Sequence, residues 1–322
     1  MPKKMGWFSG VLVAGLAATA AAQDYPTRPV RVLTPFAPGG GSEVVGRILC
    51  DHLSQAFGQS FYLETKPGGG GNIAGEILAR SPPDGHTLFL NSVVALGVNP
   101  TLYPNLSYDP VKDFVPVTML VKFTNVLEVS NKLGAKTLAE FIAFAKANPD
   151  KLNHGSPGIA TMPHLAAELL KMKLGFSSVH VPYRGTAPMA QGVLQGEVQW
   201  AFDSPTTALT MVKNGAVSVL AVAGAKRDPR FPEVATLLEQ GVPDTAWDTG
   251  HMLIAPAKTP KPVLDRLAAE IGKGFRTEAA VQRMAALGMD AFPTTPEEAA
   301  RIIAESRTRW GAVVRAANIK VE

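Results

Sequence analysis

The chain has 322 residues, of which 46% are hydrophobic, and this length supports a large core that is more typical of two domains than of one. The 31 basic residues barely outnumber the 27 acidic ones, and no run of lysines and arginines with interleaved aromatics occurs, so a nucleic-acid partner is excluded. Cys50 is the single cysteine, which excludes an internal disulfide, and its apolar helical surroundings predict a buried side chain.

The first 22 residues have the pattern of a secretory signal peptide. Lys3 and Lys4 give a positive start, residues 8–18 are apolar, and three small alanines precede Gln23. Such a segment is too short and wrongly flanked for a membrane anchor. We therefore expect export to the periplasm and a mature chain with 29 basic and 27 acidic residues. No later stretch reaches 18 uninterrupted apolar residues, which predicts a soluble mature protein.

Short β-type runs alternate with helical patterns in the first third of the chain. Strands are expected at 30–34, 61–64 and 87–91, and helices at 44–57, where Gly58 ends the pattern, and at 73–80. This βαβαβ order predicts a parallel sheet with helices on both faces. The following segment, 99–116, is rich in Pro, Asn, Asp and Tyr and is predicted to be an irregular connection.

The same alternation restarts near residue 125. A capping box of Thr137 and Glu140 opens a helix at 138–147, and Pro163 marks another helix start, after which Leu165, Leu169 and Met172 share one face. Strands are expected at 125–129, 152–154, 179–181, 199–202 and 217–223.

The last third of the chain begins with a second irregular region. It spans residues 227–249 and precedes a strand at 252–255. Thr295 and Glu298 form another capping box, and helices are expected at 263–275, 279–287 and 296–317.

Two βα blocks with a helical C-terminus predict an α/β protein made of two doubly wound lobes. We assign residues 24–123 and 253–322 to one lobe and residues 124–252 to the other. In such sheets ligands bind beyond the carboxyl ends of the strands. The loops after the strands are therefore the candidate sites.

The loop after the first expected strand, 35–42, has features of an anion site. Its three glycines let a ligand approach the backbone, and Ser42 is expected to cap a helix whose free N–H groups favour negative charge. The loop lacks the spacing of a dinucleotide or P-loop motif, and a plain tight turn is the alternative. A second glycine-rich loop, 66–72, fits ligand approach and close packing equally well. The candidate contacts in the first loop are Phe36, Ala37, Gly40, Gly41 and Ser42.

The loop at 154–164 occupies the corresponding position in the second block. Its hydroxyls and helix start suggest a matching clamp, although His164 has the alternative of being a packed helix histidine. The loop at 181–188 offers Tyr183 and Arg184, a fork for a carboxylate, with an ordinary surface pair as the alternative. The remaining candidate contacts are Ser156, Ile159, Ala160 and Thr161 in the third loop and Asn91, Ser92 and Asp203 at strand ends.

The chain lacks the usual catalytic patterns. It contains no G-x-S-x-G or H-E-x-x-H motif and no Cys/His cluster with metal-ligand spacing, and its six histidines are scattered. Without an evident nucleophile and base, binding is favoured over catalysis. We predict no cofactor and no metal site.

Several ordered motifs resemble one family. The chain resembles the Bug family, the substrate-binding proteins of tripartite tricarboxylate transporters, from about residue 24 to the C-terminus. The resemblance implies a type II periplasmic-binding-protein fold, with two lobes joined by crossing strands that close on a ligand. It also implies that the loops 35–42 and 155–164 hold one carboxylate; Glu43 stands where members usually carry Asp. The motifs are Tyr25-Pro26, 35–41, 66–72, 83–88, 108–110, 112–114 and 180–185.

The resemblance implies a function in transport and not in catalysis. We expect a monomer that captures a di-, tri- or aromatic carboxylate and hands it to membrane transporter subunits. One alternative is a protein that presents its ligand to a membrane sensor kinase. The other is a periplasmic enzyme acting on an organic acid, which would need a base and a nucleophile in the cleft.

Overall fold

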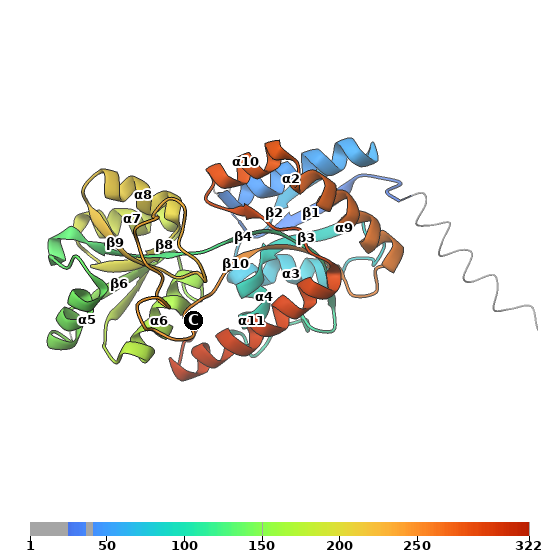
Figure 1. Cartoon of the computed structure of the whole chain (residues 1–322). Coiled ribbons are helices and arrows are strands. Elements are labelled where there is room, and N and C mark those ends of the chain that lie inside the picture. Colours follow the sequence, from blue (N-terminus) through green and yellow to red (C-terminus); the bar gives the residue numbers. More distant parts are fainter. Residues whose placement is uncertain (1–24, 37–40, 150, 322) are drawn as a thin grey trace, which may run out of the picture.

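The structure is a computed structural model that describes residues 25–36, 41–149 and 151–321. Two α/β lobes lie side by side, each built on its own sheet (Figure 1). The predicted fold class is confirmed. The expected signal peptide lies outside the described residues. None of the described helices is long and apolar enough to cross a membrane.

The sheet of the first lobe has six strands in the order β11-β4-β10-β3-β1-β2. Three of them, β1, β2 and β3, run parallel, as their βαβαβ order predicts. By contrast, β10 lies antiparallel to both β3 and β4, and β11 is antiparallel to β4. The strands are β1 (Val30–Thr34), β2 (Phe61–Thr65), β3 (Thr87–Ser92), β4 (Phe114–Phe123), β10 (Thr249–Pro256) and β11 (Asp290–Ala291).

Helices cover both faces of this sheet (Figure 1). In the first of them, Val45, Leu49 and Leu53 recur at helical spacing and are fully buried, and Gly58 ends the helix with a left-handed φ of 67°. Cys50 in the same helix is buried, as predicted. The helices are α2 (Gly41–Phe57), η1 (Gly69–Gly71), α3 (Asn72–Ala79), α4 (Val93–Leu102), α9 (Lys261–Phe275), α10 (Glu278–Ala286) and α11 (Pro296–Ala316).

The prediction of an irregular connection at 99–116 was wrong at both ends, because α4 extends to residue 102 and β4 begins at 114. Gly97 and Pro100 weaken the helical pattern of α4. Tertiary packing outweighs this weakness, since a Cβ atom on Gly97 would lie only 2.7 Å from the Ser306 hydroxyl of α11. The glycine is therefore what lets α11 approach α4.

The sheet of the second lobe has five strands in the order β7-β6-β8-β5-β9. β6 runs parallel to β7 and β8, whereas β5 lies antiparallel to β8 and β9. The predicted capping box of Thr137 and Glu140 is present at the start of α5. The elements are β5 (Val126–Ser130), η2 (Asn131–Leu133), α5 (Leu138–Ala147), β6 (Asn153–Ser156), α6 (Met162–Leu174), β7 (Val179–Pro182), α7 (Thr186–Gln195), β8 (Trp200–Asp203), α8 (Pro205–Lys213) and β9 (Val217–Val222).

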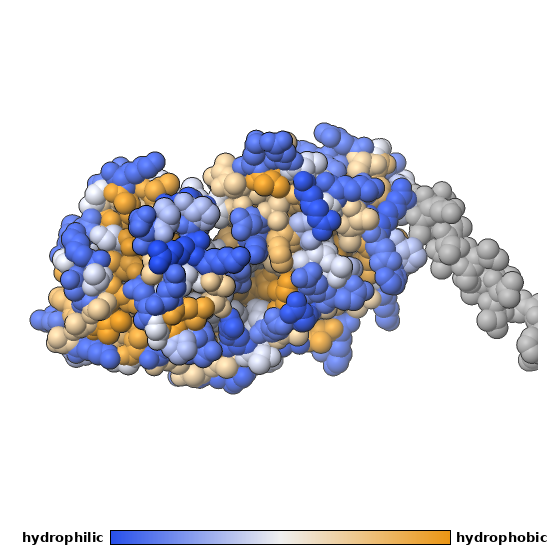
Figure 2. Space-filling model, viewed as in Figure 1, coloured by the Kyte–Doolittle hydropathy of each residue, from blue (hydrophilic) through white to orange (hydrophobic). Residues whose placement is uncertain are grey.

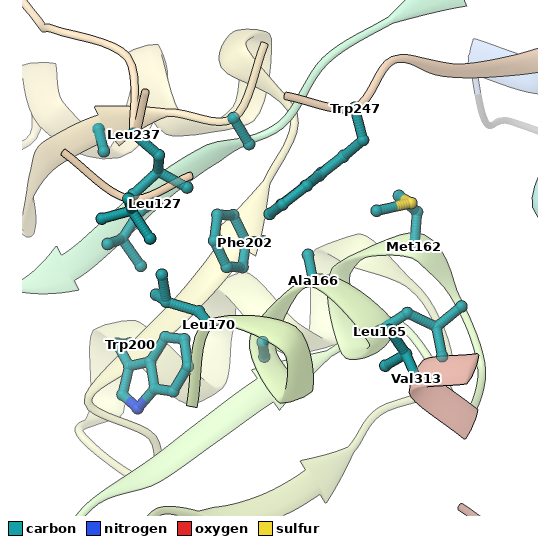
Figure 3. Close-up of a cluster of buried hydrophobic side chains, with 14 of the residues drawn as sticks. Leu127, Met162, Leu165, Ala166, Leu170, Trp200, Phe202, Leu237, Trp247 and Val313 are labelled. Atoms are coloured by element: carbon teal, nitrogen blue, oxygen red, sulfur yellow. The ribbon is translucent and has the colours of Figure 1, made fainter. Parts of the chain in front are cut away.

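The side of α6 that is buried in the core of this lobe differs in part from the predicted one. Met172 is 42% exposed, and Leu169 is only partly buried. Leu165 is buried in the core, as predicted, and Ala166 and Leu170 join it there in place of Leu169 and Met172 (Figure 3). The true apolar stripe is therefore shifted around the helix, and alanines form part of it.

The chain crosses between the lobes twice, and α11 joins them a third time. β4 ends at Phe123 and β5 starts at Val126, while β10 brings the chain back at Thr249, inside the region predicted as irregular. α11 lies along α4 and extends under the second lobe (Figure 1). Its Trp310, Val313 and Val314 belong to the core of that lobe. At the other end of α11, Thr295 accepts the N–H of Glu298, one half of the predicted capping box.

Candidate functional site

The start of α2 lies directly beyond the carboxyl end of β1. Ala37 and Gly40 fall outside the described residues. Ser42 is the second residue of α2 and therefore not its cap as expected; its Oγ lies 2.8 Å from Nε2 of His251. The first N–H groups of α2 lack intrahelical partners and carry the positive end of the helix dipole. This helix start can therefore accept an anion.

His251 is a residue of this site that sequence reasoning missed. It is buried in β10, opposite Ser92 of β3, and its ring lies 4.8 Å from that of Phe36 and 5.3 Å from that of Phe123. Burial lowers the pKa of His251 to about 4, so the ring is neutral at pH 7. Its Nδ1 is buried without a hydrogen-bond partner among the described residues. The signal in the sequence that could have identified this residue is a histidine directly before the apolar run 252–255.

The two lobes repeat one arrangement at the ends of β3 and β8. Oδ1 of Asn91 accepts the N–H of Ser92 at 2.8 Å, and Ser92 caps α4. Oδ1 of Asp203 accepts the N–H of Ser204 at 2.6 Å, and Ser204 caps α8. The three sequence-predicted residues Asn91, Ser92 and Asp203 thus build the turns from strand to helix, one turn in each lobe.

Asp203 belongs to a buried carboxyl pair with Glu128. Glu128 lies on β5, two residues from Val126, the partner of Asp203 in the sheet. Its two carboxyl oxygens and Oδ2 of Asp203 are buried and have no hydrogen-bond partner in the part of the chain that the structure describes. Burial raises the pKa of Asp203 to about 7; burial and the nearby Asp203 raise the pKa of Glu128 well above its usual value. The pair therefore tends to keep protons that exposed carboxyls lose.

The loop after β6 uses its hydroxyls internally. Oγ of Ser156 contacts the backbone of Gly158 and lies 2.7 Å from Nε2 of His180. Thr161 donates its hydroxyl to the carbonyl of Gly158. Ala160 has a left-handed φ of 60°, and the side chain of Ile159 is 41% exposed. This loop can therefore offer its backbone and an apolar side chain to a ligand more readily than its hydroxyls.

His164 is packed, as the alternative interpretation held. Its Nδ1 accepts the N–H of Ala160 at 3.0 Å, and its ring stacks on that of His180 with centroids 3.7 Å apart. The ring of His154 lies 5.0 Å from that of His180. Burial lowers the pKa of His164 to about 4 and that of His180 to about 3. Three histidines that are scattered in the sequence thus form one cluster.

The loop after β7 lies beside the loop after β6. Tyr183 donates its N–H to the carbonyl of Ser156, and Gly185 donates to Pro157. The hydroxyl of Tyr183 donates to Glu197 at 2.9 Å, and burial together with Glu197 raises the pKa of Tyr183 to about 12. This hydroxyl is therefore occupied, whereas Arg184 is exposed.

The glycine-rich loop 66–72 packs against the end of β3. A Cβ atom on Gly71 would lie 3.0 Å from Nδ2 of Asn91, and one on Gly70 would lie 2.9 Å from the hydroxyl of Tyr103. Both glycines have positive φ angles. The structure thus accounts for these glycines by close packing.

The lobes touch near the starts of α2 and α8. Arg230 lies 3.4 Å from the hydroxyl of Thr206 in α8 and 3.5 Å from the carbonyl of Gly288 in the first lobe. Met289 follows, and its Cε would lie 3.2 Å from a Cβ atom on Gly41. A notch separates the two lobes in Figure 2. Helix starts from both lobes therefore lie close to this contact between the lobes.

A family model and several known proteins match this chain over most of its length. The model of the tripartite tricarboxylate transporter family receptor matches residues 45–319. Protein BugT of Bordetella pertussis is 31% identical over 313 residues, covering 97% of this chain and 96% of that protein. A protein of Cupriavidus necator, described as a UPF0065 protein in the gbd 5' region, is 33% identical and covers 94% of this chain and 91% of its own length.

Solved structures with the same fold include proteins with bound dicarboxylates. Rpa4515 of R. palustris with adipate has a TM-score of 0.83 and 29% identity, covering 92% of this chain and 99% of that one. MatC of Rhodopseudomonas palustris with bound malate has a TM-score of 0.79 and 31% identity, covering 90% and 100%. The periplasmic binding protein BugD has a TM-score of 0.80 and 29% identity, covering 92% and 100%.

Proposed function

Because the chain belongs to the tripartite tricarboxylate transporter receptor family, we propose that it captures a small organic carboxylate and delivers it to the membrane subunits of such a transporter. Members of this family are periplasmic, and we propose that the N-terminal segment 1–22 directs export. The protein acts by binding and not by catalysis.

The observation that carries this proposal is the start of α2, near the contact between the lobes. It follows the carboxyl end of β1, where ligands bind in α/β sheets. N–H groups at a helix start favour an anion through hydrogen bonds and the helix dipole. We assign the N–H groups of Gly41 and Ser42 to one carboxylate of the ligand.

The second lobe contributes the loops after β6 and β7. The hydroxyls of Ser156 and Thr161 donate to the backbone within the loop. Ile159 and Ala160 therefore face the ligand with backbone and apolar atoms. Arg184 is exposed beside this loop and is the proposed partner of a second carboxylate. A dicarboxylate is the ligand class that uses both anchors, and two structural neighbours hold adipate and malate.

The energies suit reversible capture. A hydrogen bond to a charged group contributes about 1.5–3 kcal/mol. Four such bonds contribute about 6–12 kcal/mol, a range that includes the roughly 8 kcal/mol of a micromolar complex, and the ordering of the lobes absorbs any surplus. We propose that residues 24–123 with 253–322, and residues 124–252, are the halves that close, bending where the chain crosses between them.

A thermal-shift screen followed by calorimetric titration tests the proposal. Aliphatic and aromatic mono-, di- and tricarboxylates are compared with neutral sugars, and a true ligand raises the melting temperature by mass action. We expect micromolar binding of a dicarboxylate. Binding of sugars with no response to any carboxylate would contradict the proposal.

A matched pair of glycine variants locates the site. A Cβ atom on Gly41 or on Gly272 meets only the flexible end of a side chain, at 3.2 and 3.4 Å, so both alanine variants should fold. Gly41→Ala should weaken carboxylate binding about tenfold or more, because it hinders approach to the backbone, whereas Gly272→Ala should not. Equal affinities would remove the start of α2 from the site.

Uptake of the ligand by a deletion strain then separates delivery to a transporter from presentation to a sensor kinase.

A further inference from the structure

Three histidines of the second lobe converge beneath the loop after β6. His154 on β6 and His180 on β7 are partners in the parallel sheet, and His164 lies in the first turn of α6. One ring nitrogen of each lies within 4.8 Å of those of the other two. All three nitrogens therefore lie within about 2.8 Å of a common point, compared with a Zn–N distance of about 2.0–2.1 Å, so they can reach one ion once the rings of His164 and His180 turn out of their parallel stack.

A serine hydroxyl lies within hydrogen-bonding distance of one ring nitrogen of His154 and of one of His180. Nδ1 of His154 lies 3.1 Å from the hydroxyl of Ser178, and Nε2 of His180 lies 2.7 Å from that of Ser156. Hydroxyls accept as well as donate, so both rings can place their proton on the held nitrogen and present a lone pair at the other. Partners of this kind orient metal-binding imidazoles in proteins. Nε2 of His154 is buried and has no hydrogen-bond partner among the described residues.

A carboxylate lies beside two of the rings. Oε1 of Glu168 is 3.4 Å from Nε2 of His154 and 3.9 Å from Nε2 of His164. Lys171 contacts both oxygens of Glu168, at 2.8 and 3.0 Å, and its side chain is 17% exposed. A cation entering the cluster competes with Lys171 for this carboxylate, and the ammonium group can move to solvent on its flexible stem.

We propose that His154, His164 and His180 form a site for a transition-metal dication of the zinc class, with Glu168 as the fourth protein donor. Three imidazoles with one carboxylate oxygen suit four-coordinate Zn²⁺ or Co²⁺. Mg²⁺ and Ca²⁺ prefer oxygen ligands and should bind poorly. The site lies in the second lobe, beneath the loop after β6, and not at the start of α2.

Metal binding requires His164 to move. Its ring now stacks on His180, and its Nδ1 accepts the N–H of Ala160. An imidazole that coordinates through Nε2 carries its proton on Nδ1, so the bond from Ala160 must break. Ala160 lies in the loop after β6 and has a left-handed φ of 60°. Loss of its hydrogen bond to His164 means that the ion acts on the conformation of that loop.

Titration of untagged, chelator-treated protein with Zn²⁺ tests the site. We expect one equivalent to bind and His180→Gln to lower the affinity about tenfold or more. His52→Gln is the matched control, because His52 lies in α2 and contacts the carbonyl of Glu270 in the first lobe. This control should bind Zn²⁺ as the unmodified chain does.

Co²⁺ provides a readout that needs no variant. Bound to the unmodified chain, it should give the strong visible absorption of a four-coordinate site, and excess Zn²⁺ should remove that absorption. Failure of the folded chain to bind Zn²⁺, or unchanged affinity in both His180→Gln and His164→Gln, would overturn the proposal. The titrations contain no carboxylate, so their outcome is independent of the proposed transport function.

Discussion

Ser42 and His251 are 209 residues apart in the sequence, yet Oγ of Ser42 lies 2.8 Å from Nε2 of His251. This contact ties the first turn of α2 to β10, one of the two segments that cross between the lobes. The start of α2 is therefore fixed by a strand that enters the sheet much later in the chain. The contact joins the proposed anion site to the proposed hinge.

The contact gives a prediction for stability. Ser42→Ala leaves a buried imidazole nitrogen without its partner, and we expect the free energy of unfolding to fall by about 1–3 kcal/mol. Replacing both partners, with Ser42→Ala and His251→Phe together, should recover most of that loss, because no polar group then remains unpaired. Urea unfolding of the single and double variants measures the coupling. Additive effects would show that the two side chains do not interact.

A second prediction concerns the crossing strand. A Cβ atom on Gly250 would overlap the carbonyl oxygen of Val121, and backbone cannot move aside as a side chain can. Gly250→Ala should lower the free energy of unfolding by roughly 2–4 kcal/mol. Gly272→Ala inside α9 should raise it by about 0.5–1 kcal/mol, because alanine favours a helix. Effects of the same sign in urea unfolding would contradict this.

The buried carboxyl pair predicts a pH dependence. In the unfolded chain Glu128 and Asp203 lose their protons near pH 4, whereas burial keeps their pKa values raised in the folded protein, that of Asp203 to about 7. Their stabilising effect is thus complete below pH 4 and is lost as the pH rises through 7. Glu128→Gln should flatten this decline and add roughly 1–3 kcal/mol at pH 8.

Thermal unfolding between pH 4 and pH 8 checks this prediction. Glu233→Gln, at an exposed glutamate, is the control and should follow the unmodified chain. If Glu128→Gln has the same pH profile as the control, the pair is ionised in the folded protein.

The last prediction concerns α11. Trp310 is 3% exposed, and its ring lies 5.6 Å from that of Trp247, so a helix packed along the first lobe contributes to the core of the second. Trp310→Ala should lower the free energy of unfolding by about 3–5 kcal/mol. Thr308→Ala, at an exposed position two residues earlier, should change it little. Comparable effects of both variants in calorimetry would show that this contact does not join the lobes.

Local patterns predicted most of the elements. The spacing of Val45, Leu49 and Leu53 indicated α2, and Thr137 with Glu140 indicated the start of α5, because both signals act within a few residues. α4 escaped prediction because Gly97 and Pro100 disfavour a helix locally, whereas the close approach of α11 to Gly97 is a contact between distant segments. Met172 was assigned to the wrong face because alanines carry part of the true apolar stripe.

The sequence by itself determined the α/β class and the two blocks, and it placed the proposed anion site in the loops after strands. These features follow from hydrophobic periodicity and turn chemistry, which are local. Only the tertiary structure decided that His251 meets Ser42, that Glu128 and Asp203 share a buried site, and that His154, His164 and His180 converge. Each of these depends on strand order and register between distant segments, since register decides which side chains become neighbours and how deeply they are buried.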